Sequence, residues 1–351
     1  MHKMSARIVS METLKEERRK ALVGQTIERK IPFFVAGELF GEATLRIVNG
    51  EMETYEITSP IGEMLTNNMT RKELLEKVVL DVELGKTEIP LLYKPVYETL
   101  EDSNFPEVFD AAWAIYGSII FLEHLEGGEV RFGSMQVEQG PIARITSYAA
   151  GFEYTERMVK FNQTFNMELL NRSFGEAYNA LLNHIHFAPI LTYTYADANK
   201  TAATGEATDS LAIKTKKTLQ SALQTCALSK RPGNVLLAAT ADKYTIEESL
   251  KEQTVAGTNY PGIGEISTII FYDGWETKVA RKTYTYAGVS AGKCYLIRPK
   301  KGFKELIKED LLIDTERADL SRLVEAQVVG RCYRGVFASL PENVQEITLP
   351  T

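Results

Sequence analysis

Apolar residues recur at helical spacing over residues 151–189, the longest such stretch of the chain. They form two rows, with Phe161, Phe165 and Leu169 in the first and Leu170, Phe174, Tyr178, Leu181, Leu182 and Ile185 in the second. Thr155 is a suitable N-cap, and Pro189 limits the helix at its other end. The pattern therefore predicts a helix over 155–186, roughly 48 Å long. Because the second row is rotated from the first, we expect this spine helix to contact different elements and to connect two domains.

Before the spine helix, the pattern predicts strands, one further helix and an extended segment. Short runs over 31–60 predict strands with a hairpin turn at Asn49 and Gly50. A capping box of Thr70 and Glu73 predicts a helix that runs to about Leu84 and that Gly85 ends. Three prolines and little periodicity over 86–110 predict an arm that lies extended on another part of the molecule.

After the spine helix, strands and helices alternate. A strand is predicted at 190–195, and the alternation over 206–317 predicts a compact α/β unit. Apolar and basic residues alternate over 326–338, which predicts a long strand, and a short terminal strand is expected at 343–349.

Residues 113–154 have the pattern of a long β-hairpin with apolar groups on both faces. The alternation slips by one residue at Gly133 and Ser134, as at a β-bulge. A two-stranded ribbon is only marginally stable by itself in water, so this hairpin needs a surface to pack on. That surface belongs either to its own domain or to a neighbouring subunit. In the second interpretation, the contact residues are Phe132, Met135, Val137, Pro141, Ile142 and Ile145.

The composition limits the possible partners and compartments. The chain has 351 residues, of which 44% are hydrophobic and 25% charged, as in ordinary globular proteins. The formal net charge of -7 argues against a general affinity for nucleic acid. The longest apolar run, 111–122, is too short to span a bilayer, so no membrane partner is expected. The three cysteines are far apart in the sequence and are expected to be buried free thiols in a cytoplasm.

No residue pattern predicts a catalytic, cofactor or metal site. The segment GVSAGKC at 288–294 is one residue short of a phosphate-binding loop and precedes a predicted strand. His184 and His186 are two residues apart and point to different faces of a helix. The acidic group of Glu305, Glu309 and Asp310 has the spacing of solvated helix faces.

Two long blocks resemble the major capsid proteins of tailed phages, the Hong Kong 97-type fold. The block GGEVRFGSMQVEQGPIARITSYAAGFEYTERMVKFNQTF, continued by LNRSFGEAYNALLNHIH, is similar to the hairpin and spine helix of prophage capsid proteins. The segment RADLSRLVEAQVVGRCYRGVFA is similar to the closing strand of their peripheral domain. The order of elements agrees over about 105–351, whereas the first hundred residues match nothing in the family.

The resemblance implies an α+β fold with four parts. Residues 1–112 are an N-terminal arm or extra region, and 113–154 are the extended loop that lies across the next subunit. Residues 155–205 and 318–351 form the peripheral domain with the spine helix, and 206–317 form the axial domain. In the family, a loop of the axial domain meets other subunits at the shell axes. The glycine-rich loop at 253–264 is the candidate for this contact, which makes Tyr260 and Pro261 contact residues.

The implied function is that of a major capsid protein without enzymatic activity, cofactor or metal. It assembles in the host cytoplasm, as pentamers and hexamers, into an icosahedral virion shell around double-stranded DNA. Scaffolding, portal and decoration proteins are the further partners, and no membrane is involved. An alternative with the same fold is an encapsulin-type compartment that holds protein cargo. A third hypothesis is a cytoplasmic enzyme with its site in 206–317, motivated by the glycine-rich loop and the basic groups of Lys293 and Arg298.

Overall fold

The structure is a computed structural model with mixed α+β organisation, as the sequence predicts. It describes residues 26–48, 50–53, 61, 68–110, 142–255, 258–279, 282–319 and 324–350. The extended arm over 86–110 is partly helix and partly strand. The first strand of the long hairpin lies outside the described residues. None of the described helices is long and apolar enough to cross a membrane.

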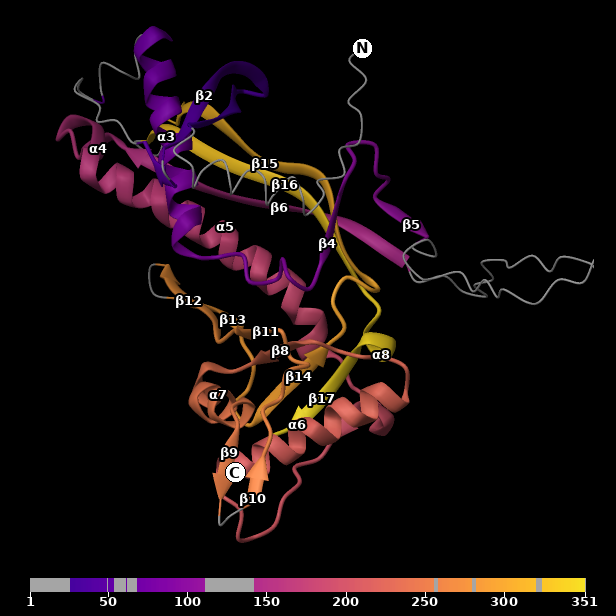
Figure 1. The fold of residues 1–351 in the computed structure, drawn as a ribbon. Helices are drawn as coiled ribbons and strands as arrows, with labels where there is room; N and C mark the ends of the chain where they lie inside the picture. The colour runs from indigo at the N-terminus through magenta and orange to yellow at the C-terminus, as the bar shows by residue number, and fades with distance from the viewer. Residues whose placement is uncertain are drawn as a thin grey trace, which may run out of the picture.

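A large sheet forms one end of the molecule (Figure 1). Its strand order is β3-β2-β1-β15-β16-β6-β5, and β4 adds to β15 in parallel. The strands are β1 (Ile27–Val35), β2 (Glu38–Val48), β3 (Glu51–Met52), β4 (Glu98–Glu101), β5 (Val108–Asp110), β6 (Ile142–Thr155), β15 (Phe303–Asp319) and β16 (Val324–Ala338). The predicted hairpin turn before Gly50 joins β2 to β3, and the predicted long strand is β16.

A smaller sheet forms the other end, with strand order β11-β8-β14-β17-β7. Its strands are β7 (Lys200–Thr201), β8 (Val235–Ala238), β11 (Thr268–Phe271), β14 (Lys293–Ile297) and β17 (Val344–Thr348). Helices α6 (Leu211–Leu228), α7 (Lys243–Leu250) and α8 (Leu340–Asn343) accompany it. Two hairpins project from it, β9 (Gln253–Val255) with β10 (Thr258–Tyr260) and β12 (Gly274–Val279) with β13 (Lys282–Ala287).

The spine is two helices, α4 (Glu156–Lys160) and α5 (Thr164–Thr192), and not the single helix that the sequence predicts. Thr155 caps α4 as expected, because its side chain accepts a hydrogen bond from the Met158 N–H. The break follows from a tertiary contact. Asn162 has φ of 47°, and its Oδ1 accepts a hydrogen bond from the Ile61 backbone at 3.0 Å.

The spine also continues past Pro189 to Thr192, and residues 193–195 belong to no strand, so the predicted strand at 190–195 is wrong. A proline in the last turn removes one helical hydrogen bond. Phe187 and Ile190 on either side of it are fully buried, and this packing offsets the loss.

Helix α5 contributes to the core at both ends of the molecule. Its Met167 packs with α3 (Asn68–Glu88) and the large sheet, around Val78 and Ile313. Further along, Leu182 and Phe187 pack with the small sheet. The spine therefore connects the two sheets through its own buried side chains, as the rotating apolar rows predict.

Gly85 does not end the helix before the spine, because α3 continues to Glu88. A Cβ at Gly85 would collide with the Arg172 carbonyl of α5, and one at Gly175 would collide with the Val82 carbonyl of α3. The two glycines therefore let the helix backbones approach closely at their crossing.

The structure of residues 303–319 also differs from the prediction. The acidic residues predicted on helix faces lie in strand β15, where Glu305 is 1% exposed. Two predicted domain boundaries cut across sheets as well. Strand β15 belongs to the large sheet, although the prediction places most of it in 206–317, and β17 belongs to the small sheet, although the prediction places it with 318–351. Outside these two strands, the four-part division stays a prediction.

The glycine crossing gives a first prediction. Gly175→Ala should lower the free energy of unfolding by about 1–3 kcal/mol despite the better helix propensity of alanine, because the methyl group forces α3 and α5 apart. Urea denaturation measures this change. Ser173→Ala, on the exposed side of the same helix, is the matched control and should change stability by less than about 0.5 kcal/mol. Equal effects of the two substitutions would contradict the close crossing.

Candidate assembly surfaces

The structure places some of the predicted contact residues and not others. Phe132, Met135, Val137 and Pro141 lie outside the described residues. Ile142 begins β6, where its backbone pairs with Asp110 of β5. Ile145 is buried at 4% exposure within its own chain, against Leu306 and Phe337. Its side chain is therefore not available to a neighbour, and this part of the contact prediction is wrong.

Tyr260 and Pro261 lie at the end of the β9–β10 hairpin, where Tyr260 is half-buried and Pro261 exposed. Lys216 of α6 is fully buried beneath this hairpin, and its Nζ donates to the carbonyls of Lys251 at 2.5 Å and Tyr260 at 3.2 Å. Burial lowers the pKa of the Lys216 ammonium. The two carbonyls bind the Lys216 ammonium group, which fixes the base of the hairpin on helix α6.

The first apolar row of the spine is exposed. Phe161, Phe165 and Leu169 are 71%, 75% and 55% exposed, although their spacing alone is equally typical of a core-facing row. In the second row, Tyr178 and Leu182 are buried in the core between the two sheets. A helix with two apolar rows has one more than a single core requires. That surplus is the sequence signal for a contact surface, although the spacing alone predicts contact only between elements of one chain.

The large sheet has an open face as well. Helices α3 and α5 lie on one side of it in Figure 1, and no described helix covers the other side. On that open side Leu39 is 62% and Val329 42% exposed. The apolar row on the spine is of the kind that binds a partner, whereas singly exposed apolar side chains such as these two are ordinary on a protein surface.

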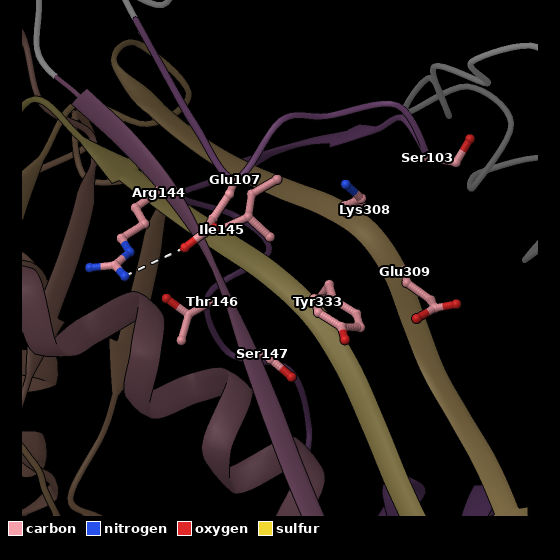
Figure 2. Close-up of a pocket in the computed structure, with 9 residues that line it drawn as sticks. All are labelled: Ser103, Glu107, Arg144, Ile145, Thr146, Ser147, Lys308, Glu309 and Tyr333. Carbon is pink, nitrogen blue, oxygen red and sulfur yellow. Dashed lines mark ion pairs between the residues drawn. The ribbon is translucent and has the colours of Figure 1, made fainter.

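A hollow of about 800 Å³ lies where β5, β6, β15 and β16 meet (Figure 2). Arg144 and Glu107 form an ion pair of 3.5 Å at its edge, and both side chains are more than two-thirds exposed. Lys308 Nζ donates to the Phe105 carbonyl at 2.7 Å. The residues that line it are Ser103, Glu107, Arg144, Ile145, Thr146, Ser147, Lys308, Glu309 and Tyr333. With exposed groups of both signs, the hollow suits a polar surface loop better than a small charged ligand.

A buried ionic cluster joins α5 to the large sheet. Arg334 of β16 donates to Glu305 at 2.5 Å and to Asp310 at 2.6 Å. Tyr93 and Thr99 donate to the two oxygens of the Glu305 carboxylate, at 2.7 and 2.8 Å. Burial raises the pKa of Asp310, but the Arg334 guanidinium, the Lys86 ammonium and the hydrogen bonds from the Leu311 N–H and the Tyr178 hydroxyl together hold that pKa well below its ordinary range. The cluster links β4 and β16 to β15, because Glu305 of β15 accepts hydrogen bonds from both Thr99 and Arg334.

His186 is stacked on Tyr93 beside this cluster, with 3.6 Å between the ring centroids. Its Nδ1–H donates to the Leu182 carbonyl at 2.6 Å, and its Nε2 faces Glu305 at 3.6 Å. The side chain is fully buried, and this burial lowers the pKa of His186 to about 4. His184 points elsewhere and stacks on Tyr286 at 4.4 Å. The two histidines therefore lie apart, as their spacing predicts.

Segment 288–294, which includes Lys293 of the enzyme hypothesis, makes its contacts within the chain. Segment 288–294 leads into β14, and the Gly292 N–H already donates to Asp242 Oδ2 at 2.9 Å. Lys293 forms an ion pair of 2.8 Å with Glu346 of β17. The three cysteines are free and buried, as expected. Across the described part of the chain, no cluster of three His, Cys, Asp or Glu side chains could hold a metal ion.

Comparison with known proteins gives structural likeness alone. No protein-family model and no curated protein sequence matches the chain. A virus-like particle from Pyrococcus furiosus has 12% identity and a TM-score of 0.49, over 78% of this chain and 99% of that one. An encapsulin complex from Synechococcus elongatus has 10% identity and a TM-score of 0.44, over 75% and 88%. The capsid of Myoviridae phage XM1 has 8% identity and a TM-score of 0.44, over 66% and 82%. Several of the other similar structures are phage structures as well.

The buried histidine gives a prediction about pH. The folded pKa of about 4 lies below the ordinary value of 6.5, so the unfolded chain binds the proton first as the pH falls. The contribution of His186 to stability is therefore complete above pH 6.5 and declines toward pH 4, by up to about 3 kcal/mol. His186→Gln should have a flatter dependence of unfolding free energy on pH over this window, measured by urea denaturation.

His184→Gln is the control for this prediction, because His184 is only half-buried and should account for less of the slope. Equal pH dependence in wild type and His186→Gln would show that His186 does not titrate as its environment requires.

Proposed function

We propose that this chain is the structural subunit of a closed shell, the major capsid protein of a tailed-phage type of particle. The exposed apolar row at Phe161, Phe165 and Leu169 carries the proposal. A spine helix buried against two sheets, yet apolar on its remaining side, requires a further protein surface. In a shell of identical subunits, that surface is another copy of the chain.

The arrangement of elements supports the same role. The β6 strand, the spine, the small α/β sheet and the closing strand β16 follow one another in the order of the capsid resemblance. The described fold is long and two-ended, with the spine running between the sheets (Figure 1). In the proposed shell, the large-sheet end acts as the peripheral domain and the small-sheet end as the axial domain. The β9–β10 hairpin then meets its copies at the centres of pentamers and hexamers.

The proposed content of the shell is double-stranded DNA. A subunit with a net charge of -7 neutralises few DNA phosphates, so it encloses DNA without binding it tightly. An encapsulin-type compartment is the alternative, and it differs by holding protein cargo.

Electron microscopy of the purified chain, alone and after co-expression with DNA-packaging or cargo proteins, tests this proposal. Closed particles are expected. Nucleic-acid density inside them supports a capsid, and a packaged protein supports the compartment. A chain that stays monomeric under all assembly conditions would rule out both.

The apolar row gives a direct prediction. The double substitution Phe161→Ser and Phe165→Ser should leave unfolding free energy within about 0.5 kcal/mol of wild type, because both rings are mostly exposed. It should abolish assembly, because each buried phenyl ring contributes about 1.5–3 kcal/mol to an interface. Light scattering and sedimentation velocity measure assembly.

Leu228→Ser serves as the control, because Leu228 is 77% exposed at the end of α6, away from the spine. It should assemble as wild type does. Normal particles from the double variant would remove the main support for the proposed function.

A further inference from the structure

Among the described residues, most of strand β6 is paired on one edge only. It pairs with β16 from Ile145 to Thr155, whereas β5 covers its other side only over 142–144. No described strand pairs with that other side over 146–155. Exposure agrees with this, because the consecutive residues Ala149, Ala150 and Gly151 are all exposed. A strand covered on both edges would have its backbone shielded along this stretch.

This second edge of β6 lacks the features that usually prevent strands from pairing with other chains. Edge strands are normally protected by lysine, proline, a bulge or short length. Residues 146–152 carry no charge and no proline, and the register with β16 is continuous from Ile145 to Tyr154. A long, regular and unprotected edge is a template for a further strand.

The charges at the two ends of the edge indicate which strand fits. Arg144 lies near the beginning of β6, where it also pairs with Glu107, and Glu153 lies near its end, where it also accepts a hydrogen bond from Gln327. A second β6 in antiparallel orientation brings the basic end of one copy to the acidic end of the other, at both ends of the pair. A parallel orientation would instead bring like charges together. The small residues in the middle then lie at the two-fold axis, where two backbones must approach closely.

We propose that two copies of this chain pair through β6, antiparallel and across a two-fold axis, so that their large sheets form one continuous sheet. This inference rests on the proposed shell function and names one of its subunit contacts. The interface is isologous, since each copy offers the same strand to the other. It leaves the exposed row of the spine for a different neighbour, as a closed shell requires.

The backbone geometry supplies a precise test. The Ile145 N–H donates to the Glu107 carbonyl on the side away from β16, at 2.8 Å. Because N–H groups alternate along a strand, the Ala149 N–H also points away from β16. Ala149→Pro therefore removes a donor that only the partner strand uses, whereas Ala149→Ser keeps that donor. Ala149→Pro should lose β6 pairing with little change in unfolding, and Ala149→Ser should retain it.

Disulfide crosslinking tests whether a second copy of the chain pairs with the edge of β6. Ala149→Cys and Ala150→Cys place a thiol at the proposed axis, in a chain whose native cysteines are all buried. Under mild oxidation of assembled material, at least one of the two should give a disulfide-linked dimer. Ala207→Cys, an equally exposed alanine in a loop of the other end, should give little. Adding Ala149→Pro to Ala150→Cys should abolish the dimer.

The outcomes separate this inference from the proposed function. Closed particles without crosslinks at positions 149 and 150 would overturn β6 pairing and leave the shell function intact. Crosslinked dimers that never form particles would support the pairing and contradict the shell. If Ala149→Pro prevents assembly and no symmetric crosslink forms, another segment occupies the edge, and self-pairing is wrong. Equal crosslinking of Ala207→Cys would also overturn it.

Discussion

The packing of α5 against both sheets is the constraint on which the rest of the structure depends. Its first turns bury Met167 with the large sheet, and its last turns bury Phe187 and Ile190 with the small one. A single rigid helix therefore fixes how the two ends of the molecule are oriented. The same arrangement leaves one apolar side of the helix, and one face of the large sheet, without cover from the described residues. The packing of α5 therefore both fixes the two sheets relative to each other and leaves apolar surface uncovered.

The ionic cluster at Arg334 serves this arrangement. Buried charges are costly unless they are paired and hydrogen-bonded, and here the Glu305 carboxylate has Tyr93, Thr99 and Arg334 around it. These groups come from the segment after α3 and from neighbouring strands of the large sheet, close to His186 of the spine. The cluster therefore fixes the junction between helix and sheet where a purely apolar contact would permit sliding.

Local patterns predicted much of the fold. The N-cap at Thr155, the spine helix and the long strand β16 all followed from spacing, because their signals lie within a few neighbouring residues. The failures depend on distant partners. The break at Asn162 requires Ile61, and the acidic spacing of β15 resembled a helix because its partner Arg334 lies 24–29 residues away. The local pattern predicts a helix end at Gly85, because its close contact with α5 has no signature among neighbouring residues.

The contact surfaces were predictable only in part, for the same reason. The sequence showed two apolar rows on the spine, but only the packed structure shows that the first remains exposed. It could not show that Ile145 is buried in the core of its own chain, or that most of β6 is paired on one edge only among the described residues. Such distinctions require knowing which surfaces the chain has already covered by itself.

The central claim is that surfaces left open in one chain are closed by copies of the same chain. Amide hydrogen exchange, compared between dispersed subunits and assembled particles, tests it most directly. The account predicts that residues 146–155 and 161–165 become protected on assembly, while the core strands β8 and β14 do not change. Particles in which these two segments exchange as fast as in the free subunit would contradict it.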